Sequence, residues 1–206
     1  ISIPTSVKSI GRNAFDGCSL MTEIILSSSI TSIDDYTFSR CASLLQITIP
    51  SSVKSIKKYA FNKCKSIKQI IFRSSLETIE NGAFSECSSL TQINLPSSIT
   101  TICENTFAKC TSLTKLTLHP ALKSIKFNAF SDCSSLTQLT IPSSVTSIGD
   151  GSFSGCSNLI KIKIPSSMTS IQNNSFEKCS SLKEVVIPSS VTKIGDYSFF
   201  GCSSLE

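Results

Sequence analysis

The apolar positions of this chain recur at one fixed spacing, which phenylalanine and cysteine mark most clearly. A Phe is followed three residues later by a Cys, and the pair returns every 23 residues without a slip in register. A solenoid requires such regularity, because each rung presents the same apolar side chains to its neighbours. The pattern predicts about nine 23-residue rungs. The nine pairs are Phe15/Cys18, Phe38/Cys41, Phe61/Cys64, Phe84/Cys87, Phe107/Cys110, Phe130/Cys133, Phe153/Cys156, Phe176/Cys179 and Phe199/Cys202.

Within one repeat, the apolar and polar positions predict a strand. In the copy that starts at Cys133, apolar residues come 3, 6 and 8 positions later, as Leu136, Leu139 and Ile141. This L-x-x-I-x-I spacing is typical of the strand of leucine-rich repeats, and its alternation turns one face inward. Pro142 then ends the strand, since proline lacks the N–H that a parallel neighbour would need.

The rest of the repeat predicts turns and a second short extended segment. A Ser-Ser pair after the proline favours a turn, and the β-branched V-T-S-I segment favours a short strand. The segment 195–201 is expected to form one helical turn with its Phe packed inward, too short to be stable alone. The expected fold is therefore a leucine-rich repeat solenoid, α/β but mostly β. A parallel sheet covers one face, and turns with short helical turns cover the other.

These motifs resemble the BspA-like leucine-rich repeat family. The I-P-S-S-V-T-S-I-G run at 141–149 and the S-F-x-x-C-x-x-L pattern at 198–205 carry the resemblance, and near-copies extend it over the whole chain. The resemblance implies a right-handed solenoid. It also implies attachment to a cell surface or secretion, as in surface proteins of host-associated bacteria and parasitic protists, and binding to host or neighbouring proteins. The family has no shared catalytic residues to carry over.

Composition adds one point, which concerns cysteine. Lys and Arg exceed Asp and Glu by only five, too few to identify a nucleic-acid binder. Nine of the ten cysteines occupy one core position of the repeat. Stacked Cys side chains run parallel, whereas a disulfide needs Cβ vectors that converge, so buried free thiols are expected. Cys103, the tenth, is expected to be partly exposed.

No enzyme, metal site or cofactor site is predicted. The one histidine, His119, stands where its repeat would carry the strand-ending proline, and no C-x-x-C pair occurs, so a zinc site is not expected. The sequence has no G-x-S-x-G elbow and no glycine-rich phosphate loop. A hydrolase is an alternative for which no residue can be proposed.

The outward face of the predicted sheet is the first candidate binding surface. Positions 4, 5 and 7 after each cysteine form columns along the stack, with neighbours about 4.8 Å apart. Most are Thr, Gln or Lys, but some are apolar although the fold does not require it. The alternative is a solvated face whose ladders only join the rungs. The residues predicted to bind proteins are Leu45, Gln69, Ile71, Gln92, Lys115, Gln138, Ile160, Lys161, Lys163 and Val186.

A basic band over residues 40–73 is the second candidate. No acidic residue occurs between Tyr36 and Leu76, so the band is a hypothetical site for sulphated glycan, anionic lipid headgroups or nucleic acid. No interleaved aromatic residues support base stacking, and a solvated band without function is the alternative. The residues concerned are Lys54, Lys57, Lys58, Lys63, Lys65, Lys68 and Arg73.

The chain as a whole is predicted to be one domain, 1–206, within a longer repeat array. It opens and stops inside a repeat without a cap, and the alternative is a complete solenoid that associates end to end. The predicted partners are other proteins, such as host extracellular-matrix or cell-surface proteins, with sulphated glycans second and no membrane insertion of this segment. The alternative to a surface protein is a cytoplasmic repeat scaffold.

Overall fold

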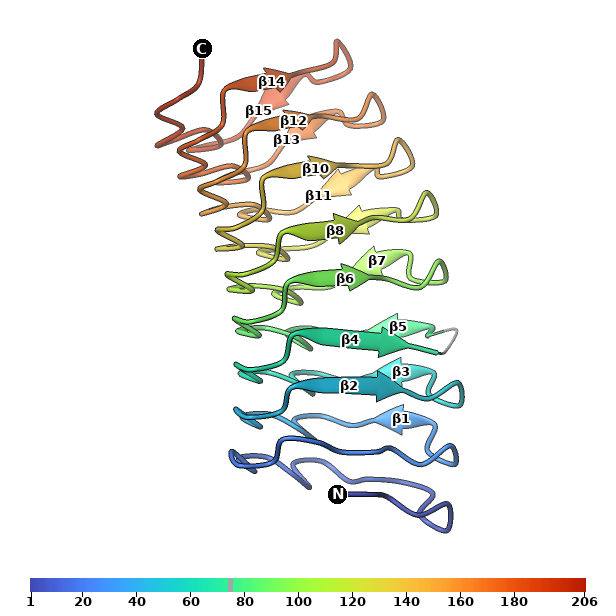
Figure 1. Cartoon of the computed structure of the whole chain (residues 1–206). Coiled ribbons are helices and arrows are strands. Elements are labelled where there is room, and N and C mark those ends of the chain that lie inside the picture. Colours follow the sequence, from blue (N-terminus) through green and yellow to red (C-terminus); the bar gives the residue numbers. More distant parts are fainter. Residues whose placement is uncertain (74–75) are drawn as a thin grey trace.

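A computed structural model describes residues 1–73 and 76–206. The chain winds into a column of stacked rungs whose two termini lie at opposite ends (Figure 1). A typical rung has a longer strand on one wall and a two-residue strand on another, and turns connect them. The leucine-rich repeat solenoid predicted from the sequence is confirmed.

The longer strands form what we call the front wall. Their pairings are parallel with partners 23 residues apart, so that Leu139 lies beside Ile162 and Ile162 beside Val185. In β2, exposed and buried residues alternate, and Ile47 and Ile49 point into the core, as the alternation predicted. The front strands are β2 (Gln46–Ile49), β4 (Gln69–Phe72), β6 (Gln92–Asn94), β8 (Lys115–Thr117), β10 (Gln138–Thr140), β12 (Lys161–Lys163) and β14 (Glu184–Val186).

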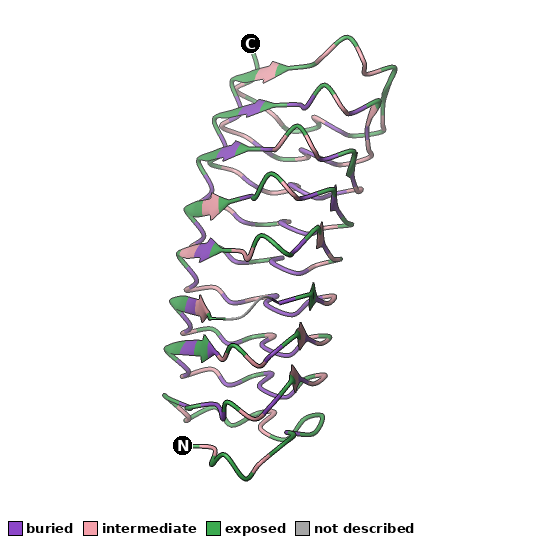
Figure 2. Ribbon diagram, turned by 90° about the vertical axis from the view of Figure 1, so that its right-hand side faces the viewer, coloured by how far each residue is buried: buried purple, intermediate pink, exposed green. Residues whose placement is uncertain are grey.

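The V-T-S-I segments form a second set of parallel strands, the rear wall, which confirms the predicted second short strand. Ile33 lies beside Ile56 and Ile56 beside Ile79, and all three are buried. The two walls therefore face each other across a shared core (Figure 2). The rear strands are β1 (Ser32–Ile33), β3 (Ser55–Ile56), β5 (Thr78–Ile79), β7 (Thr101–Ile102), β9 (Ser124–Ile125), β11 (Ser147–Ile148), β13 (Ser170–Ile171) and β15 (Lys193–Ile194).

A third wall, which we call the turn ridge, runs from two residues before each Phe to two residues after it. The helical turns expected here were wrong: the described residues form turns instead. The first and last residues of the segment have positive φ, as in Asn128 (φ 51°) and Asp132 (φ 56°). Their N–H groups, and that of Phe130 between them, donate to carbonyls of the next rung. Because these N–H groups point along the column, they cannot make the i→i−4 bonds of a helix.

The turn ridge joins the rungs without interruption. Three N–H groups cross each junction, from those of Asn13, Phe15 and Gly17 at the first to those of Asn174, Phe176 and Lys178 at the last. The front and rear strands instead divide into groups of two or three. Within the described residues, the ridge therefore holds the most continuous backbone ladder of the column.

The number of rungs depends on which wall is counted. Rings from Phe15 to Phe199 form one stack of nine, as predicted, but the described front wall has only seven strands. The front segments of the first two rungs meet in an isolated bridge between Ser2 and Ile25. The outermost rung has a neighbour on one side only, so fewer ladder bonds define a strand there.

The Phe stack is the centre of the core. Neighbouring rings lie 5.3–5.7 Å apart and within 14° of parallel. Phe38 through Phe176 have no exposed surface, whereas Phe15 and Phe199 at the two ends are half-buried. Such offset stacking adds to the free energy gained from burial of the rings themselves. Cohesion therefore depends on contact between successive rungs.

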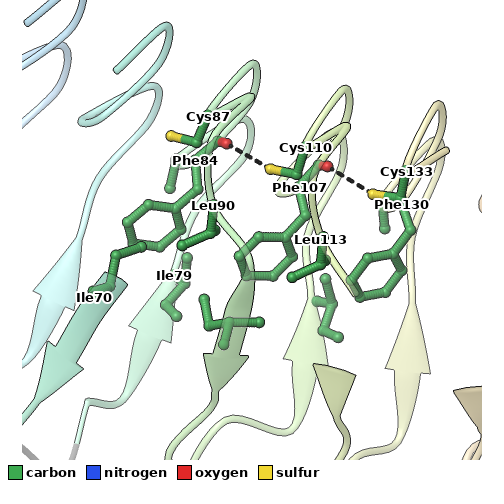
Figure 3. Packing of buried hydrophobic residues seen from close by; sticks show 14 of the residues in the cluster. Ile70, Ile79, Phe84, Cys87, Leu90, Phe107, Cys110, Leu113, Phe130 and Cys133 are labelled. Atoms are coloured by element: carbon green, nitrogen blue, oxygen red, sulfur yellow. Dashed lines mark hydrogen bonds between the residues drawn. The ribbon is translucent and has the colours of Figure 1, made fainter. Parts of the chain in front are cut away.

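The cysteine column lies beside the Phe stack, and its thiols also form hydrogen bonds between rungs. Each thiol from Cys41 onward donates to the carbonyl of the Phe one rung back, as Cys110 does to Phe84 at 3.3 Å and Cys133 to Phe107 at 3.2 Å (Figure 3). All ten cysteines are free, and Cys103 is half-buried, as expected. Cys18 is exposed, contrary to expectation, because it lies in the outermost rung that the structure describes.

Thiol reactivity provides a direct check on this arrangement. We expect the exposed Cys18 to react first with a chromogenic disulfide reagent at neutral pH, and the half-buried Cys103 and Cys202 to react more slowly. The buried thiols should react only on unfolding, and ten thiols should then be counted without reductant. A lower count would mean that disulfides have formed and that the free-thiol column is wrong. The buried thiols are those of Cys41, Cys64, Cys87, Cys110, Cys133, Cys156 and Cys179.

Candidate functional site

The front wall places the predicted protein-binding residues in register. Pairing sets Gln138 beside Lys161 and Lys161 beside Glu184, and it sets Gln92 beside Lys115. Each outward position of the repeat therefore forms a column that runs along the stack. Because the side chains project from hydrogen-bonded strands, their positions are largely fixed before any partner arrives.

Burial separates the predicted residues into two groups. Ile71 and Gln92 are half-buried, so neither presents its full side chain to a partner. Leu45, Ile160 and Val186 expose 49%, 44% and 42% of their surface. The exposed members of the predicted set are Leu45, Gln69, Lys115, Gln138, Ile160, Lys161, Lys163 and Val186.

Charged residues lie beside the exposed Ile160 and Val186 at the C-terminal part of the front wall. Lys163 lies beside Val186 on the neighbouring strand. The Lys161 Nζ lies 2.8 Å from Glu184 Oε2, and both side chains are more than half exposed. An ion pair this exposed contributes little to stability. This part of the front wall therefore combines exposed apolar side chains with charges whose stabilising role is minor.

A hollow of about 340 Å³ lies at the N-terminal part of the front wall and includes a residue that the sequence reading did not single out. Ile25 lines it and is 57% exposed. Glu23 and Arg73 also line it. Ile25 could have been predicted in the same way as Leu45, because it is an apolar residue at an outward position of the repeat. Arg73 stands where most repeats have the strand-ending proline, and it contributes to this hollow.

The basic band is spread over several walls of the column. Lys57 lies on the rear side of its rung and Lys63 on the turn ridge, whereas Arg73 lines the front hollow. Lys57 Nζ lies 3.0 Å from Glu80 Oε1, one rung further on.

Acidic residues of neighbouring rungs also lie within the band. Lys57 and Lys58 share a small hollow with Asp34, Asp35 and Glu80. The acid-free stretch of sequence is therefore not an acid-free surface, because residues 23 positions apart become neighbours. Lys63 likewise approaches a glutamate of the next rung, at 3.8 Å. Polyanion binding by Lys54, Lys57, Lys58, Lys63, Lys65, Lys68 and Arg73 stays a prediction without a gathered site.

Neither the single histidine nor the groups that could hold a metal ion mark a further site within the described residues. His119 Nδ1 accepts a hydrogen bond from the Ala121 N–H at 3.1 Å, which suits a turn residue. Across residues 1–73 and 76–206, His, Cys, Asp and Glu do not gather in threes that could hold a metal ion. A helix long and apolar enough to cross a membrane is also absent from these ranges.

Comparison with known families identifies the repeat. The model of the BspA type leucine rich repeat region matches residues 1–111 and 77–206, in 6 copies. The two matches together span the whole chain. The search of curated proteins found no significant match.

Solved structures give the same picture. A leucine rich cell surface protein from Faecalibacterium prausnitzii A2-165 has a TM-score of 0.74 and 26% identity, over 100% of this chain and 67% of that one. A T. pallidum leucine rich repeat protein has a TM-score of 0.60 and 27% identity, over 86% of this chain and 72% of that one. The pneumococcal vaccine antigen PcpA has a TM-score of 0.61 and 28% identity, over 91% of this chain but only 58% of its own.

Proposed function

The chain belongs to the BspA-type leucine-rich repeat family, and on that basis we propose that it is a protein-binding module of a cell-surface or secreted protein that contacts host proteins, as an adhesin does. Repeat scaffolds of this kind are typically non-enzymatic. Similarity to a leucine rich cell surface protein and to a vaccine antigen supports the surface location over a cytoplasmic one.

Exposed apolar side chains on the front wall are the observation that carries this proposal. Leu45, Ile160 and Val186 each expose more than two fifths of their surface on a face whose other residues are mostly Thr, Gln and charged residues. The solenoid does not need apolar residues there, since other rungs carry Thr or Lys at the same positions. Exposed apolar groups with polar surroundings are typical of interaction sites.

The geometry of the wall favours binding of a protein over binding of a small molecule. The outward columns continue over seven described strands, and the exposed Leu45, Ile160 and Val186 do not line the front hollow. A small ligand, in contrast, requires a concave site. A protein partner can meet many pre-ordered side chains with little loss of conformational entropy. Only a few of these contacts are expected to dominate the affinity, and the apolar residues bordered by lysine are the candidates.

The test is a binding assay on an array of purified extracellular-matrix and cell-surface proteins. Where the chain binds, we expect the double variant Ile160→Ser/Lys163→Glu to weaken binding about tenfold or more, since it removes an apolar anchor and reverses a neighbouring charge. Asp150→Ser/Lys178→Ser, off the front wall, is the matched control and should bind normally. Loss in the control with retention in the front-wall variant would contradict the proposal, and so would an array without any binding.

A further inference from the structure

A furrow runs along the turn ridge, on a different side of the column from the front strands. Two hollows of about 390 Å³ and 580 Å³ share Tyr36, Asn62 and Lys63 as lining residues and therefore join end to end. The first hollow begins at Asn13 and the second reaches Asp132. The furrow thus follows the column over the first six Phe-bearing rungs.

The two edges of the furrow arise from the left-handed backbone positions of each ridge segment. One edge is the column two residues before the Phe, with Tyr36 and Tyr59. The other is the column two residues after it, with Lys63 and Lys109. The position after the Phe lies between the edges and holds smaller residues, so a trough is left open. The residues at that position are Asn62, Ser85, Ala108 and Ser131.

The two tyrosines are not required by the fold. The centroids of their rings lie 5.2 Å apart, and the ring planes differ by 16°. Their φ values of 56° and 55° are unfavourable for a bulky side chain. Most other rungs have Asn or Gly in this column, such as Asn13 and Asn105, which tolerate positive φ. The Tyr59 ring lies across Gly82, where an added Cβ would come within 2.2 Å of it. Tyr36 is 40% exposed and borders both hollows.

The charges that line the furrow cancel. Five of the charged residues stand in the second edge and Asp16 lies beside it, directly after Phe15. The charged lining residues are Asp16, Arg40, Lys63, Glu86, Lys109 and Asp132, three acids and three bases. Arg40 Nη2 lies 2.6 Å from Asp16 Oδ2, and Lys63 approaches Glu86 at 3.8 Å. A strongly anionic or cationic ligand would therefore meet an equal number of like charges. A ligand without net charge fits this furrow better.

The backbone beside the furrow offers no site for adding a strand. In each ridge segment along the furrow, the N–H of the Phe and those of both edge residues donate to the next rung, and the N–H groups between them donate within the rung. An extended peptide that binds by adding a strand needs unpaired backbone groups. Side-chain amides, carboxylates and ammonium groups remain as the recognition groups, with the tyrosine pair beside them.

From these features we infer that the furrow binds a neutral, linear oligosaccharide. Sugar hydroxyls both donate and accept hydrogen bonds, which matches a trough lined by Asn, Ser, Asp, Glu and Lys side chains. The negative face of an aromatic ring attracts the polarised C–H groups on the face of a pyranose ring. A linear chain of sugars also matches a straight trough built from repeating rungs. The site is independent of the protein-binding front wall.

Tyrosine fluorescence reports on this site directly. The chain has no Trp and three Tyr, so a Tyr197→Phe variant carries tyrosine only in the furrow. We expect its emission to change in a saturable way with at least one of a panel of neutral hexasaccharides of glucose, mannose, xylose and N-acetylglucosamine, and calorimetry to give the same affinity. If no member of the panel binds, the inference is wrong.

Variants then locate the binding. Tyr36→Asn places in the column a residue that other rungs already have, so the fold is kept while the ring is lost, and affinity should fall about tenfold. Tyr36→Phe should bind within about threefold of the parent, since it keeps the ring. Ser131→Phe should block the trough, whereas Ile160→Ser on the front wall should change nothing.

Two outcomes overturn the assignment of the ligand. Unchanged affinity in both Tyr36→Asn and Ser131→Phe, with melting temperatures that show intact folding, places the sugar elsewhere. Binding of a heparin hexasaccharide but of no neutral one, with affinity that falls steeply with salt, shows polyanion recognition instead. A front-wall variant that binds sugar normally but loses its protein partner separates the two sites.

Discussion

Replacing Phe130 by alanine is expected to lower the free energy of unfolding by about 3–5 kcal/mol, in the range of other large-to-small changes in cores. Its ring has no exposed surface and is stacked between those of Phe107 at 5.5 Å and Phe153 at 5.6 Å. The change leaves a cavity with walls on both sides that a regular stack cannot easily close. Urea unfolding followed by circular dichroism measures the loss.

The matched control is the same substitution at the end of the stack. Phe199 is half-buried and meets only one neighbouring ring, that of Phe176 at 5.5 Å. Phe199→Ala should therefore cost clearly less than Phe130→Ala. Equal losses at the two sites would argue against a stack held together by contacts between nearest neighbours.

Alkaline pH is expected to unfold the protein steeply in the presence of reductant. Burial raises the pKa of Cys110 and of Cys156 to about 12, whereas a thiol in the unfolded chain has a pKa near 8.5. Below the pKa of the unfolded chain, the thiol keeps its proton in both states, and the free energy of unfolding is at its full value. As the pH rises toward 12, only the unfolded state releases the proton, so stability falls by about 1.4 kcal/mol per pH unit for each such thiol.

The other buried thiols act in the same direction, because burial raises the pKa of Cys64, Cys87 and Cys133 as well. Urea unfolding between pH 8 and 11 gives the slope. The variant Cys110→Ala/Cys156→Ala should be less stable at pH 7, but its slope should be shallower by about 3 kcal/mol per pH unit. The two proteins differ only at these two thiols, so the difference between their slopes isolates the thiol contribution. Equal slopes would show that the thiols do not drive the loss.

The core could be predicted from the sequence because a solenoid repeats its contacts as well as its residues. One Phe and one Cys per period were enough to locate the stack and the thiol column. Burial near the ends was not predictable from residue type. Phe15 and Cys18 have the same identities as Phe130 and Cys133, yet they are more exposed because, within the described residues, only one neighbouring rung packs against theirs.

The turn ridge was predicted poorly for a different reason. Its conformation alternates through left-handed positions that Asn and Gly signal in some rungs, as at Asn105 and Gly151. Tyr36 and Tyr59 occupy the same positions without any such signal. Only the bonds from each rung to the next reveal that the segment cannot be helical. The furrow followed from that conformation and was therefore not predicted.

The charge pattern shows a further limit of reading along the chain. A stretch without acids predicted a basic band, yet Lys57 and Lys63 each meet a glutamate 23 residues further on. In a repeat protein, the relevant neighbours of a side chain lie one period away. The exposed apolar residues of the front wall were easier to predict, because their orientation follows from position within the repeat alone.

The ladder of the turn ridge has a mechanical consequence. Each described rung is bonded to the rungs before and after it, so an inner rung is held at two junctions and an outermost rung at one. Under tension between the two ends, the outermost rung should therefore detach first. The column should then lengthen by peeling one rung at a time instead of rupturing in a single event. Each rung would release about 80 Å of extended chain, since a residue spans at most roughly 3.3–3.6 Å. A cell-surface protein built in this way would lengthen in equal steps under a pulling force, and its rungs would refold when the force falls.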